Sequence, residues 1–515
     1  MRFPLDVSPI TCLGLQKSIT PASGPEVRSF FPHREIDYRS MTRIGLISLS
    51  DGRPYVAGDT DSHVRAAQAA VEAVLRDAGH EVVAVAAPIT DSAAAVREAR
   101  ALGAAGVDAA ILHYCVWAFP HFSAIVASEL DVPLLLLSNI DPAYPGMVGM
   151  LAAGGALDQV GRRHERAYGD PTDPAVRDKL LRFVRAAGAV GALRGSTFGR
   201  IGGRSMGMNT AVANTDQWRR KFGVDVEEID QWEIVRRSAL VDDARVRAGR
   251  EWLERHVGTI HYDGDRLTPE LLERQIRSYH AMRELIDEWG LDFTGIKAQP
   301  ELTANFATMD VTEAFLNDPY DWEGPKAPHV CATEADMDGA LTMQLLKGLT
   351  GTPVLFADVR HYDAENDVWD LCNSGQHATW YAARSEDPAE NLRHVQLFPS
   401  DFYFPAGGAS VHHVAAATDA TFARLTRLDG RYRLQVARGE LVTLDDATST
   451  RLQQASSPTW PHAWARLDAS VEEILGRFGA NHVHAVPGDV EAELATICRL
   501  LDVDLDRLGG ARSDG

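Results

Sequence analysis

Short apolar runs alternate with amphipathic helical patterns from Arg43 to Asp358. Such runs are typical of buried strands, and the longer patterns between them place apolar residues at helical spacing. Strands that alternate with helices form parallel sheets covered on both faces. The alternation therefore predicts two doubly wound, Rossmann-like α/β domains, one over residues 41–173 and one over residues 174–358.

The pattern changes after Arg360, where long helical periods stop and short β-like pieces begin. Two of these pieces flank Asp429-Gly430, a strong hairpin signal. Residues 359–515 are therefore expected to form a mostly β, barrel-like domain with a final helix. Residues 1–40 are rich in proline, show no sustained period and lack the apolar core of a signal peptide. We expect them to be a disordered leader or an overlong start.

Composition limits the partners. The net charge of −21 argues against nucleic acid or an anionic membrane as a partner. The five cysteines are scattered and form no C-x-x-C pair, which fits a reduced, cytoplasmic setting better than a disulfide framework. No apolar stretch is long enough to span a membrane. These features are consistent with an enzyme or binding protein for small molecules.

Two carboxylates follow successive apolar runs. Glu334 comes directly after the run that ends at Thr333, and Asp358 comes after the run 354–357. A helical pattern lies between them, so the stretch is predicted to be one βαβ unit. Open α/β sheets bind ligands outside such strand ends, and two carboxylates there suit a divalent metal or an acid/base pair. The alternative for either residue is the N-cap of a following helix.

Four short motifs stand in a distinctive order: A-T-E (332–334), F-A-D-V-R (356–360), N-S-G-Q-H (373–377) and G-A-N-H (479–482). A D-G-R (51–53), a glycine-rich loop (202–208) and S-x-T-W-P-x-x-W (457–464) accompany them. With these motifs the chain resembles the L-fucose isomerase family, which is related to L-arabinose isomerase. The resemblance covers essentially Met41 to Val503.

The resemblance implies an aldose–ketose isomerase with a divalent metal, usually Mn²⁺, with Mg²⁺ or Co²⁺ as alternatives. It implies that Glu334, Asp358 and His482 are the metal ligands and that the two carboxylates also move the proton through an enediolate. Two hard oxygens and one imidazole leave open positions on an octahedral ion, which a sugar could fill. The expected substrate is a pentose, a 6-deoxyhexose or a C6-modified hexose.

Other positions match substrate contacts of the family. These are Gln299, Ser374, Asn481 and one tryptophan of the W-P-x-x-W pair, Trp460 or Trp464. In the family, the edge of the first domain reaches a neighbouring subunit's site. Arg53 and Trp117 are expected to do so here, which implies a homo-oligomer, typically a hexamer. For Trp117, an ordinary core tryptophan is the alternative.

The histidines mark a departure from the family. Its glycine-rich loop in the β domain usually continues into a tyrosine that packs on the sugar, but here His412 and His413 follow instead. They could contact a polar or anionic C6 group, as in a sulfonated sugar, or be two solvated loop histidines. His377 is a possible fourth ligand or a pocket residue. His484 is expected to be structural, and His361 to lie at the surface.

Two other classes of protein remain as alternatives. A non-catalytic sugar-binding protein would also have two α/β lobes, but it has no use for G-A-N-H or the β domain. A metal-dependent aldolase would also use an enediolate, usually with several histidine ligands. Interconversion of aldose and ketose without a second product would exclude both.

Overall fold

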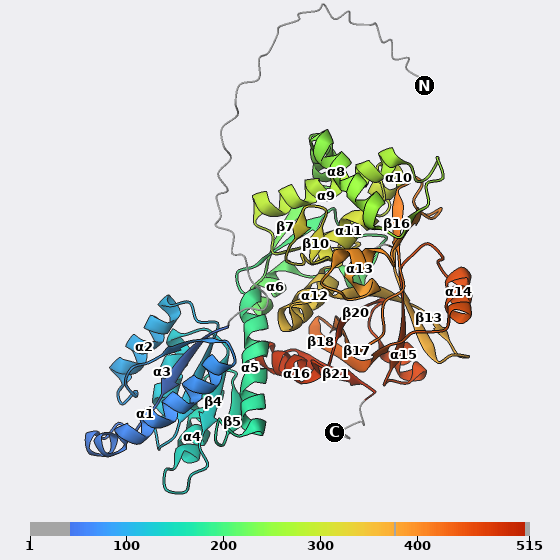
Figure 1. The fold of residues 1–515 in the computed structure, drawn as a ribbon. Helices are drawn as coiled ribbons and strands as arrows, with labels where there is room; N and C mark the ends of the chain where they lie inside the picture. Colours follow the sequence, from blue (N-terminus) through green and yellow to red (C-terminus); the bar gives the residue numbers. More distant parts are fainter. Residues whose placement is uncertain (1–41, 375–376, 510–515) are drawn as a thin grey trace, which may run out of the picture.

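The computed structural model describes residues 42–374 and 377–509 (Figure 1). The expected leader, residues 1–40, lies outside these ranges. The predicted fold class is confirmed: parallel α/β layers come first, and a mostly β region follows. Within the described ranges, no helix is both long enough and apolar enough to cross a membrane.

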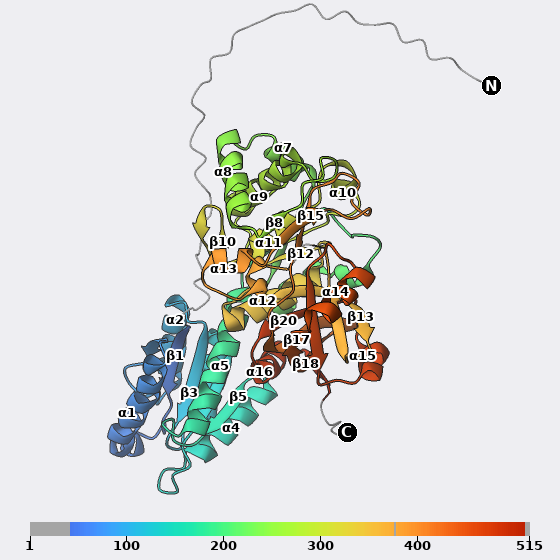
Figure 2. The ribbon, with the colours of Figure 1, turned by 45° about the vertical axis from the view of Figure 1, so that its right-hand side comes forward.

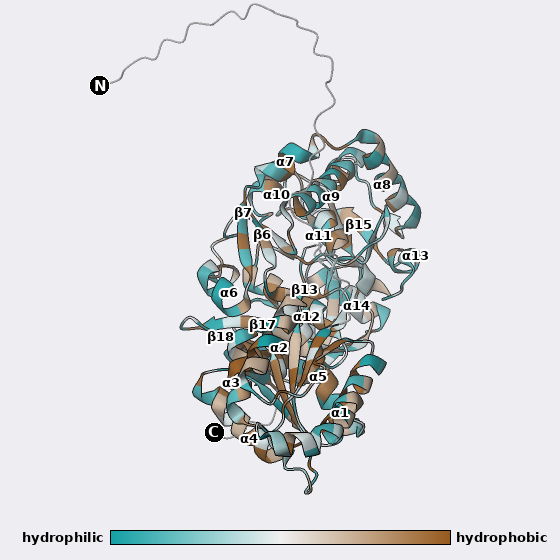
Figure 3. Cartoon of the chain, turned by 90° about the vertical axis from the view of Figure 1, so that its left-hand side faces the viewer, coloured by the Kyte–Doolittle hydropathy of each residue, from teal (hydrophilic) through white to brown (hydrophobic). Residues whose placement is uncertain are grey.

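The N-terminal sheet is fully parallel, with the order β2-β1-β3-β4-β5. Its strands are β1 (Arg43–Ser48), β2 (Glu81–Ala84), β3 (Ala109–Tyr114), β4 (Leu134–Ser138) and β5 (Glu165–Tyr168). The helices are α1 (Pro54–Asp77), α2 (Ser92–Ala104), α3 (Pro120–Glu129), α4 (Gly146–Gln159) and α5 (Pro174–Leu193). Apolar residues fill both faces, with α1 and α5 on one side and α2, α3 and α4 on the other (Figure 3). The direction in which successive strands are added to the sheet reverses between β1 and β3. Open α/β sheets bind ligands at such a reversal.

The central sheet is also parallel, with the order β12-β9-β6-β7. Its strands are β6 (Thr197–Ile201), β7 (Asp225–Ile229), β9 (Phe293–Ile296) and β12 (Cys331–Thr333). The helices of this region are α6 (Thr215–Phe222), α7 (Trp232–Ser238), α8 (Asp243–His256), α9 (Pro269–Trp289), α10 (Glu301–Asn305), α11 (Asp310–Asn317) and α12 (Met337–Thr350). The short strands are β8 (Thr259–Ile260), β10 (Tyr320–Asp321) and β11 (Gly324–Pro325).

The C-terminal region is a barrel. Strands β17-β20-β13-β14-β19-β18 form a ring that the long β17–β18 hairpin closes, and β21 extends β18. The strands are β13 (Leu355–Asp363), β14 (Val368–Cys372), β17 (Thr418–Leu428), β18 (Arg431–Leu441), β19 (His462–Leu467), β20 (His482–Pro487) and β21 (Asp504–Leu508). Helices α13 (Pro388–Leu392), α14 (Asp446–Ala455), α15 (Val471–Arg477) and α16 (Glu491–Leu501) surround it. Strands β15 (Gln396–Pro399) and β16 (Ala409–His412) form a small sheet with β8.

The hairpin turn predicted at Asp429-Gly430 is confirmed. Both residues have positive φ, 50° and 73°, as a type I′ turn requires, and β17 and β18 pair in register on either side.

One prediction about the fold is wrong: Glu334 and Asp358 do not end two strands of one βαβ unit. Strand β12 is the edge of the central parallel sheet, whereas β13 pairs antiparallel with β14 and β20 in the barrel. Residues 355–358, expected in the central domain, therefore belong to the C-terminal sheet. The reason lies in α12, whose residues 337–347 are all buried. A helix that is buried on all sides can lie between two layers: α12 packs against β9, and it also packs against the barrel strands β17 and β20, beside which it lies in Figure 2.

Candidate metal centre

Glu334 lies in a strained turn between β12 and α12. Glu334 and Ala335 both have positive φ, 59° and 50°. This left-handed conformation costs roughly 1–2 kcal/mol for a residue with a Cβ atom. The backbone holds it, because the Ala335 N–H donates to the Ile296 carbonyl (3.0 Å) and the Asp336 N–H donates to the Thr333 carbonyl (3.1 Å). Strain that the surroundings enforce is typical of functional sites.

Asp358 and His482 are directly paired residues of β13 and β20. Directly paired residues project from the same face of a sheet. His482 Nε2 lies 3.6 Å from Asp358 Oδ1 and 2.9 Å from Glu334 Oε2. The structure therefore brings together the three side chains that the sequence suggested, and it takes them from two different sheets.

The state of His482 Nε2 tests whether a metal fits here. This nitrogen is buried and makes no hydrogen bond within residues 42–374 and 377–509, although two carboxylates face it. Two carboxylates, together with an imidazole nitrogen that has released its proton, are donors that Mn²⁺ and similar divalent ions accept. The donor set therefore fits such an ion.

The charges of the centre are strongly coupled. Burial disfavours a charged imidazole, but the carboxylates of Asp336 and Glu334 overcome this and raise the pKa of His482 to about 10. Burial raises the pKa of Asp358, and the neighbouring Glu334 adds to this, while His482 lowers it. In the metal-free protein, a proton on His482 balances the carboxylates. A bound cation would take its place.

Asp336 is a member of the centre that the sequence analysis missed. Its side chain caps α12 by accepting from the Gly339 N–H (3.0 Å). The same carboxylate lies 2.6 Å from His482 Nδ1 and 2.5 Å from the guanidinium of Arg424 on β17. The N-cap alternative considered for Glu334 thus applies to Asp336, two residues later. The sequence signal for this role was the position of Asp336 directly before the helical pattern.

Comparison with known proteins decides the family. Three family models match in chain order: the first N-terminal domain of L-fucose isomerase over residues 41–195, the second N-terminal domain over 289–351 and the C-terminal domain over 371–508. The chain belongs to the L-fucose isomerase family.

Curated relatives agree with the three models. The chain is 28% identical over 450 residues to the L-fucose isomerase of Streptococcus pneumoniae (strain P1031), which covers 73% of this chain and 76% of the relative. The L-fucose isomerase of S. pneumoniae (strain CGSP14) is 28% identical over 451 residues, with the same coverage. The protein is therefore an aldose–ketose isomerase, an intramolecular oxidoreductase.

Amide side chains orient Asp358 in this isomerase. Asn481 donates to Asp358 Oδ1 (3.0 Å), and Asn373 donates to Asp358 Oδ2 (3.2 Å). Asn481 was expected to contact the substrate, whereas Asn373 was not singled out although it opens the N-S-G motif. Ser374 is buried next to it, with its hydroxyl 3.4 Å from Asn373 Oδ1. The N-S-G and G-A-N-H motifs thus both supply an amide that binds the Asp358 carboxylate.

Gln299 lies near the C-terminal end of β9, the strand that pairs with β12. Its backbone carbonyl accepts from the Ser205 hydroxyl (3.2 Å), which belongs to the glycine-rich loop after β6. The order of the central sheet reverses between β6 and β9, so this loop and Gln299 border the crevice that ligands use in such sheets.

The two tryptophans of the W-P-x-x-W pair differ. Trp460 lies with its ring 5.0 Å from the Arg360 guanidinium, which follows Asp358 in the same motif. Trp464 is 1% exposed, packs against Val368 in a small apolar cluster, and donates its Nε1–H to the Ser449 hydroxyl (3.0 Å). Trp464 is thus a core residue, whereas Trp460, which is 6% exposed and packs with Cys372 and Phe404, lies beside the motif that carries Asp358.

The alternative of two solvated loop histidines is wrong. His412 is on β16 and is 8% exposed, and His413 is fully buried. His412 contacts Gln453 Oε1 through Nε2 (2.9 Å), and the His413 ring lies 5.9 Å from the ring of buried His377. All four residues of β16 are buried, so these side chains are not solvated as those of an exposed loop would be. These histidines contact one another and the barrel wall.

Burial lowers the pKa of His412 to about 4 and that of His377 to about 3, and it holds the pKa of His413 well below its usual range. The three rings are therefore neutral near pH 7. His484 is buried beside Arg424, with Nε2 3.2 Å from Nη1, and His361 is exposed, as the sequence predicted for both.

A second cluster lies in the same barrel. Asp370, Cys372 and His462 are buried, and their possible ligand atoms lie within 4.8 Å of one another. However, His462 is already engaged at both nitrogens, with Nδ1 2.8 Å from Asp370 Oδ1 and Nε2 3.0 Å from the Ser457 carbonyl. Burial holds the pKa of the Cys372 thiol well above its usual range. The cluster is close enough for an ion but lacks an unused imidazole nitrogen.

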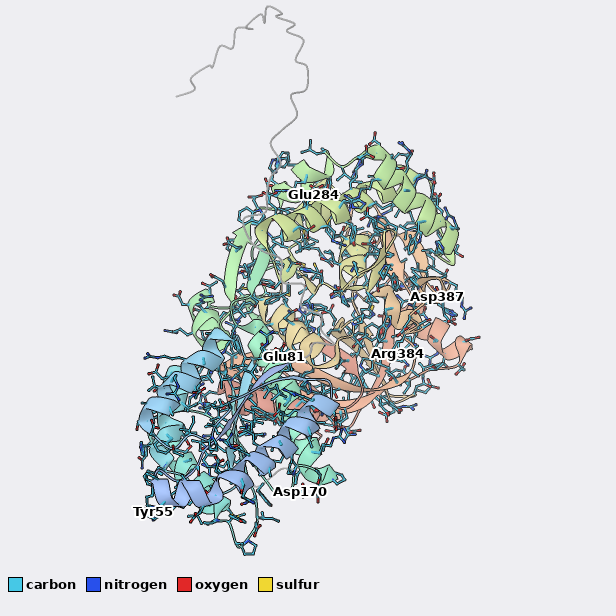
Figure 4. The ribbon with its side chains drawn as sticks, turned by 60° about the vertical axis from the view of Figure 1, so that its left-hand side comes forward. Tyr55, Glu81, Asp170, Glu284, Arg384 and Asp387 are labelled. Carbon is cyan, nitrogen blue, oxygen red and sulfur yellow. The ribbon has the colours of Figure 1, made fainter. Side chains whose placement is uncertain are left out.

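Arg53 and Trp117 lie elsewhere, in the N-terminal domain. They follow β1 and β3, at the reversal of strand order. Arg53 is exposed and pairs with Asp51 at 2.5 Å. Nearby Tyr55 marks the outer lower left of the molecule, far from Arg384 on the other side (Figure 4). Arg53 is thus exposed and Trp117 half-buried, both directly after strands at the reversal of strand order in their own domain.

Proposed function

We propose that this isomerase depends on a divalent metal, with Mn²⁺ preferred and Mg²⁺ or Co²⁺ as alternatives, and converts an aldose to a ketose through an enediolate. The observation that carries the proposal is the meeting of Glu334, Asp358 and His482 from two sheets around an imidazole nitrogen without a hydrogen bond. These three residues would hold the ion.

The ion would polarise the sugar carbonyl and lower the pKa of the adjacent hydroxyl. The chain itself would move the proton between C2 and C1 with Glu334 and Asp358, one as base and the other as acid. Two features support this role for Asp358. Its pKa is raised by burial, toward the range useful for proton transfer, and two amides fix both of its oxygens.

The remaining contacts are proposed from their places around the centre. Gln299, Ser374, Asn481 and Trp460 would bind the sugar. Arg53 and Trp117 would complete the site of a neighbouring subunit, because they follow β1 and β3 at the strand-order reversal of the N-terminal domain, apart from the residues of the metal centre. A homohexamer is the expected assembly. Within the described ranges, the four cysteines are buried and no disulfide joins them, which fits the proposed cytoplasmic setting.

The substrate is proposed as a pentose, a 6-deoxyhexose or a C6-modified hexose. The relatives carry the name L-fucose isomerase. His412 and His413 stand where the family usually has a tyrosine, which favours a substrate with a different C6 end. Because burial keeps both rings neutral, they offer hydrogen bonds but no charge. This favours a hydroxyl over a sulfonate at C6, so a sulfonated sugar is the second candidate.

A panel assay on metal-stripped protein with Mn²⁺ restored tests the proposal. The panel would hold L-fucose, D-arabinose, other pentoses and hexoses, and C6-sulfonated and C6-carboxylated aldoses. We expect one sugar to give a ketose, with loss of turnover on adding a chelator. Full turnover in metal-free protein, or a second product from any sugar, would overturn it.

A further inference from the structure

A buried ion pair lies behind His482, on the side away from the candidate ligands. We propose that Asp336 and Arg424 are positioning residues that hold His482 with its Nδ1 protonated and its Nε2 turned to Glu334 and Asp358, and thereby set the affinity for the metal. This inference rests on the proposed metal-dependent function. It adds Asp336 and Arg424 to the proposed metal centre as residues that act through His482 and touch neither the ion nor the sugar.

The contacts use the whole carboxylate of Asp336. Its Oδ2 lies 2.6 Å from His482 Nδ1 and 2.5 Å from Arg424 Nη1, and its Oδ1 accepts from Arg424 Nη2 (3.1 Å) and the Gly339 N–H (3.0 Å). The three side chains are at most 1% exposed. Both oxygens of Asp336 thus face N–H donors, and the Arg424 guanidinium pairs with this carboxylate as an ion. An ionised carboxylate only accepts, so Nδ1 must donate and Nε2 is the nitrogen left for an ion.

The surroundings leave this arrangement little freedom. A Cβ atom on Gly339 would stand 2.7 Å from both Arg424 Nη1 and Asp336 Oδ2, so a larger residue there would displace the ion pair. Arg424 also donates to the Thr210 carbonyl (3.2 Å) and to His484 Nε2 (3.2 Å). Since a guanidinium has no acceptor, His484 must accept through Nε2. Contacts with Gly339, Thr210 and His484 thus hold the ion pair in place.

The pair also joins the two halves of the centre. Asp336 belongs to the strained turn that carries Glu334, and Arg424 and His482 belong to barrel strands β17 and β20. A shift of this turn relative to the barrel would separate Glu334 from His482 and Asp358. The ion pair therefore fixes both the imidazole orientation and the spacing of the ligands.

A second ion pair offers a matched control. Arg427 lies on the same strand as Arg424, and its Nε is 2.8 Å from Asp338 Oδ2 on the first turn of α12. Asp338 Oδ1 accepts from the Tyr432 hydroxyl (2.9 Å) and not from a histidine. Replacing Arg427 therefore weakens the same contact between α12 and β17 without removing a partner of His482.

The test measures Mn²⁺ binding to metal-free full-length protein by the EPR signal of free Mn²⁺, beside melting temperatures of the metal-free forms. Asp336→Asn is expected to weaken binding by about 10- to 100-fold, as loss of such an orienting partner typically does. Arg424→Lys should weaken it less, and Arg427→Met should stay within about twofold of wild type. At saturating Mn²⁺, Asp336→Asn should keep the wild-type KM for the sugar.

Equal affinities for Asp336→Asn and Arg427→Met at similar melting temperatures would overturn the positioning role and leave the metal centre intact. Absence of Mn²⁺ binding by wild type would overturn the proposed function instead. Should Asp336→Asn fail to fold, Arg424→Lys carries the test: it retains the charge but loses the two-point contact, and wild-type affinity in it would refute the proposal.

Discussion

Two clusters of similar composition share one cross-strand row of the barrel, yet they differ in what their histidine nitrogens contact. The row runs His482–Asp358–Cys372–His462 across β20, β13, β14 and β19. At one end, His482 and Asp358 meet Glu334, which comes from another sheet, and Nε2 of His482 is unused. At the other end, Asp370 and the Ser457 carbonyl occupy both nitrogens of His462.

The difference teaches that proximity of His, Asp and Cys side chains does not define a metal site. A site needs a lone pair that the protein leaves unsatisfied. At His462, partners within the barrel satisfy the ring and make the cluster part of the core. At His482, the partner at Nδ1 comes from the central region and the other nitrogen is left open. The predictions below test this contrast, from the largest expected effect to the smallest.

Glu334→Gln should give the largest loss. Glutamine keeps the size of the side chain but removes the base and a charged ligand, so turnover should fall by about a thousandfold or more while the protein still folds. Initial rates and circular dichroism would measure both. Asp370→Asn is the matched change in the second cluster and should keep turnover within about tenfold. Wild-type-like activity in Glu334→Gln would remove this residue from the mechanism.

His482→Ala and His462→Ala should separate binding from stability. The first should weaken Mn²⁺ binding by about a hundredfold or more, since it removes a ligand. The second should leave binding near wild type but lower the free energy of unfolding by about 3 kcal/mol, because it strands Asp370 in the core. Mn²⁺ titration and chemical denaturation would check these outcomes. Weaker Mn²⁺ binding in His462→Ala but not in His482→Ala would mean that the second cluster, not the first, holds the metal.

Mn²⁺ affinity should rise with pH. The pKa of His482 in the folded metal-free protein, about 10, lies above its ordinary value of 6.5. Protonation therefore stabilises the metal-free fold fully below pH 6.5, and this is lost as the pH rises through 10. Metal must displace that proton, so affinity should increase by about tenfold per pH unit in the neutral range. Calorimetry in buffers of different ionisation enthalpy should report proton release; a pH-independent affinity would contradict it.

Cys372→Ala should have the smallest effect. The thiol is buried and its pKa is raised, so it is not an available ligand. Mn²⁺ affinity and turnover should both stay within about twofold of wild type. Loss of a bound metal from this variant, measured by elemental analysis, would mean that the second cluster does hold an ion.

Local motifs carried most of what the sequence could predict. They named Glu334, Asp358 and His482, which the structure brings together. They could not say which sheet β13 joins, because an apolar run is equally suited to a parallel sheet or a barrel. The signal that decides this is α12, which is buried all round and so lies between the two layers. The expected βαβ unit assumed that only one face of this helix is buried, the face of Met337, Leu341, Leu345 and Leu346.

The residues that sequence reasoning missed or misjudged depend on distant partners. Asp336 meets His482 across 146 residues, a pairing that no local pattern indicates. Likewise, His412 and His413 look like solvated loop residues until the small sheet of β8, β15 and β16 buries them. Contacts between sheets, rather than local propensity, thus determine the part of the site that could not be predicted.

A crystal structure of the Mn²⁺-loaded protein, with anomalous scattering used to locate the ion, tests the central claim most directly. We predict one strong peak bonded to Glu334, Asp358 and His482 Nε2, with Nδ1 of that ring still paired with Asp336. A peak between Asp370, Cys372 and His462 with none at the first cluster would contradict the account.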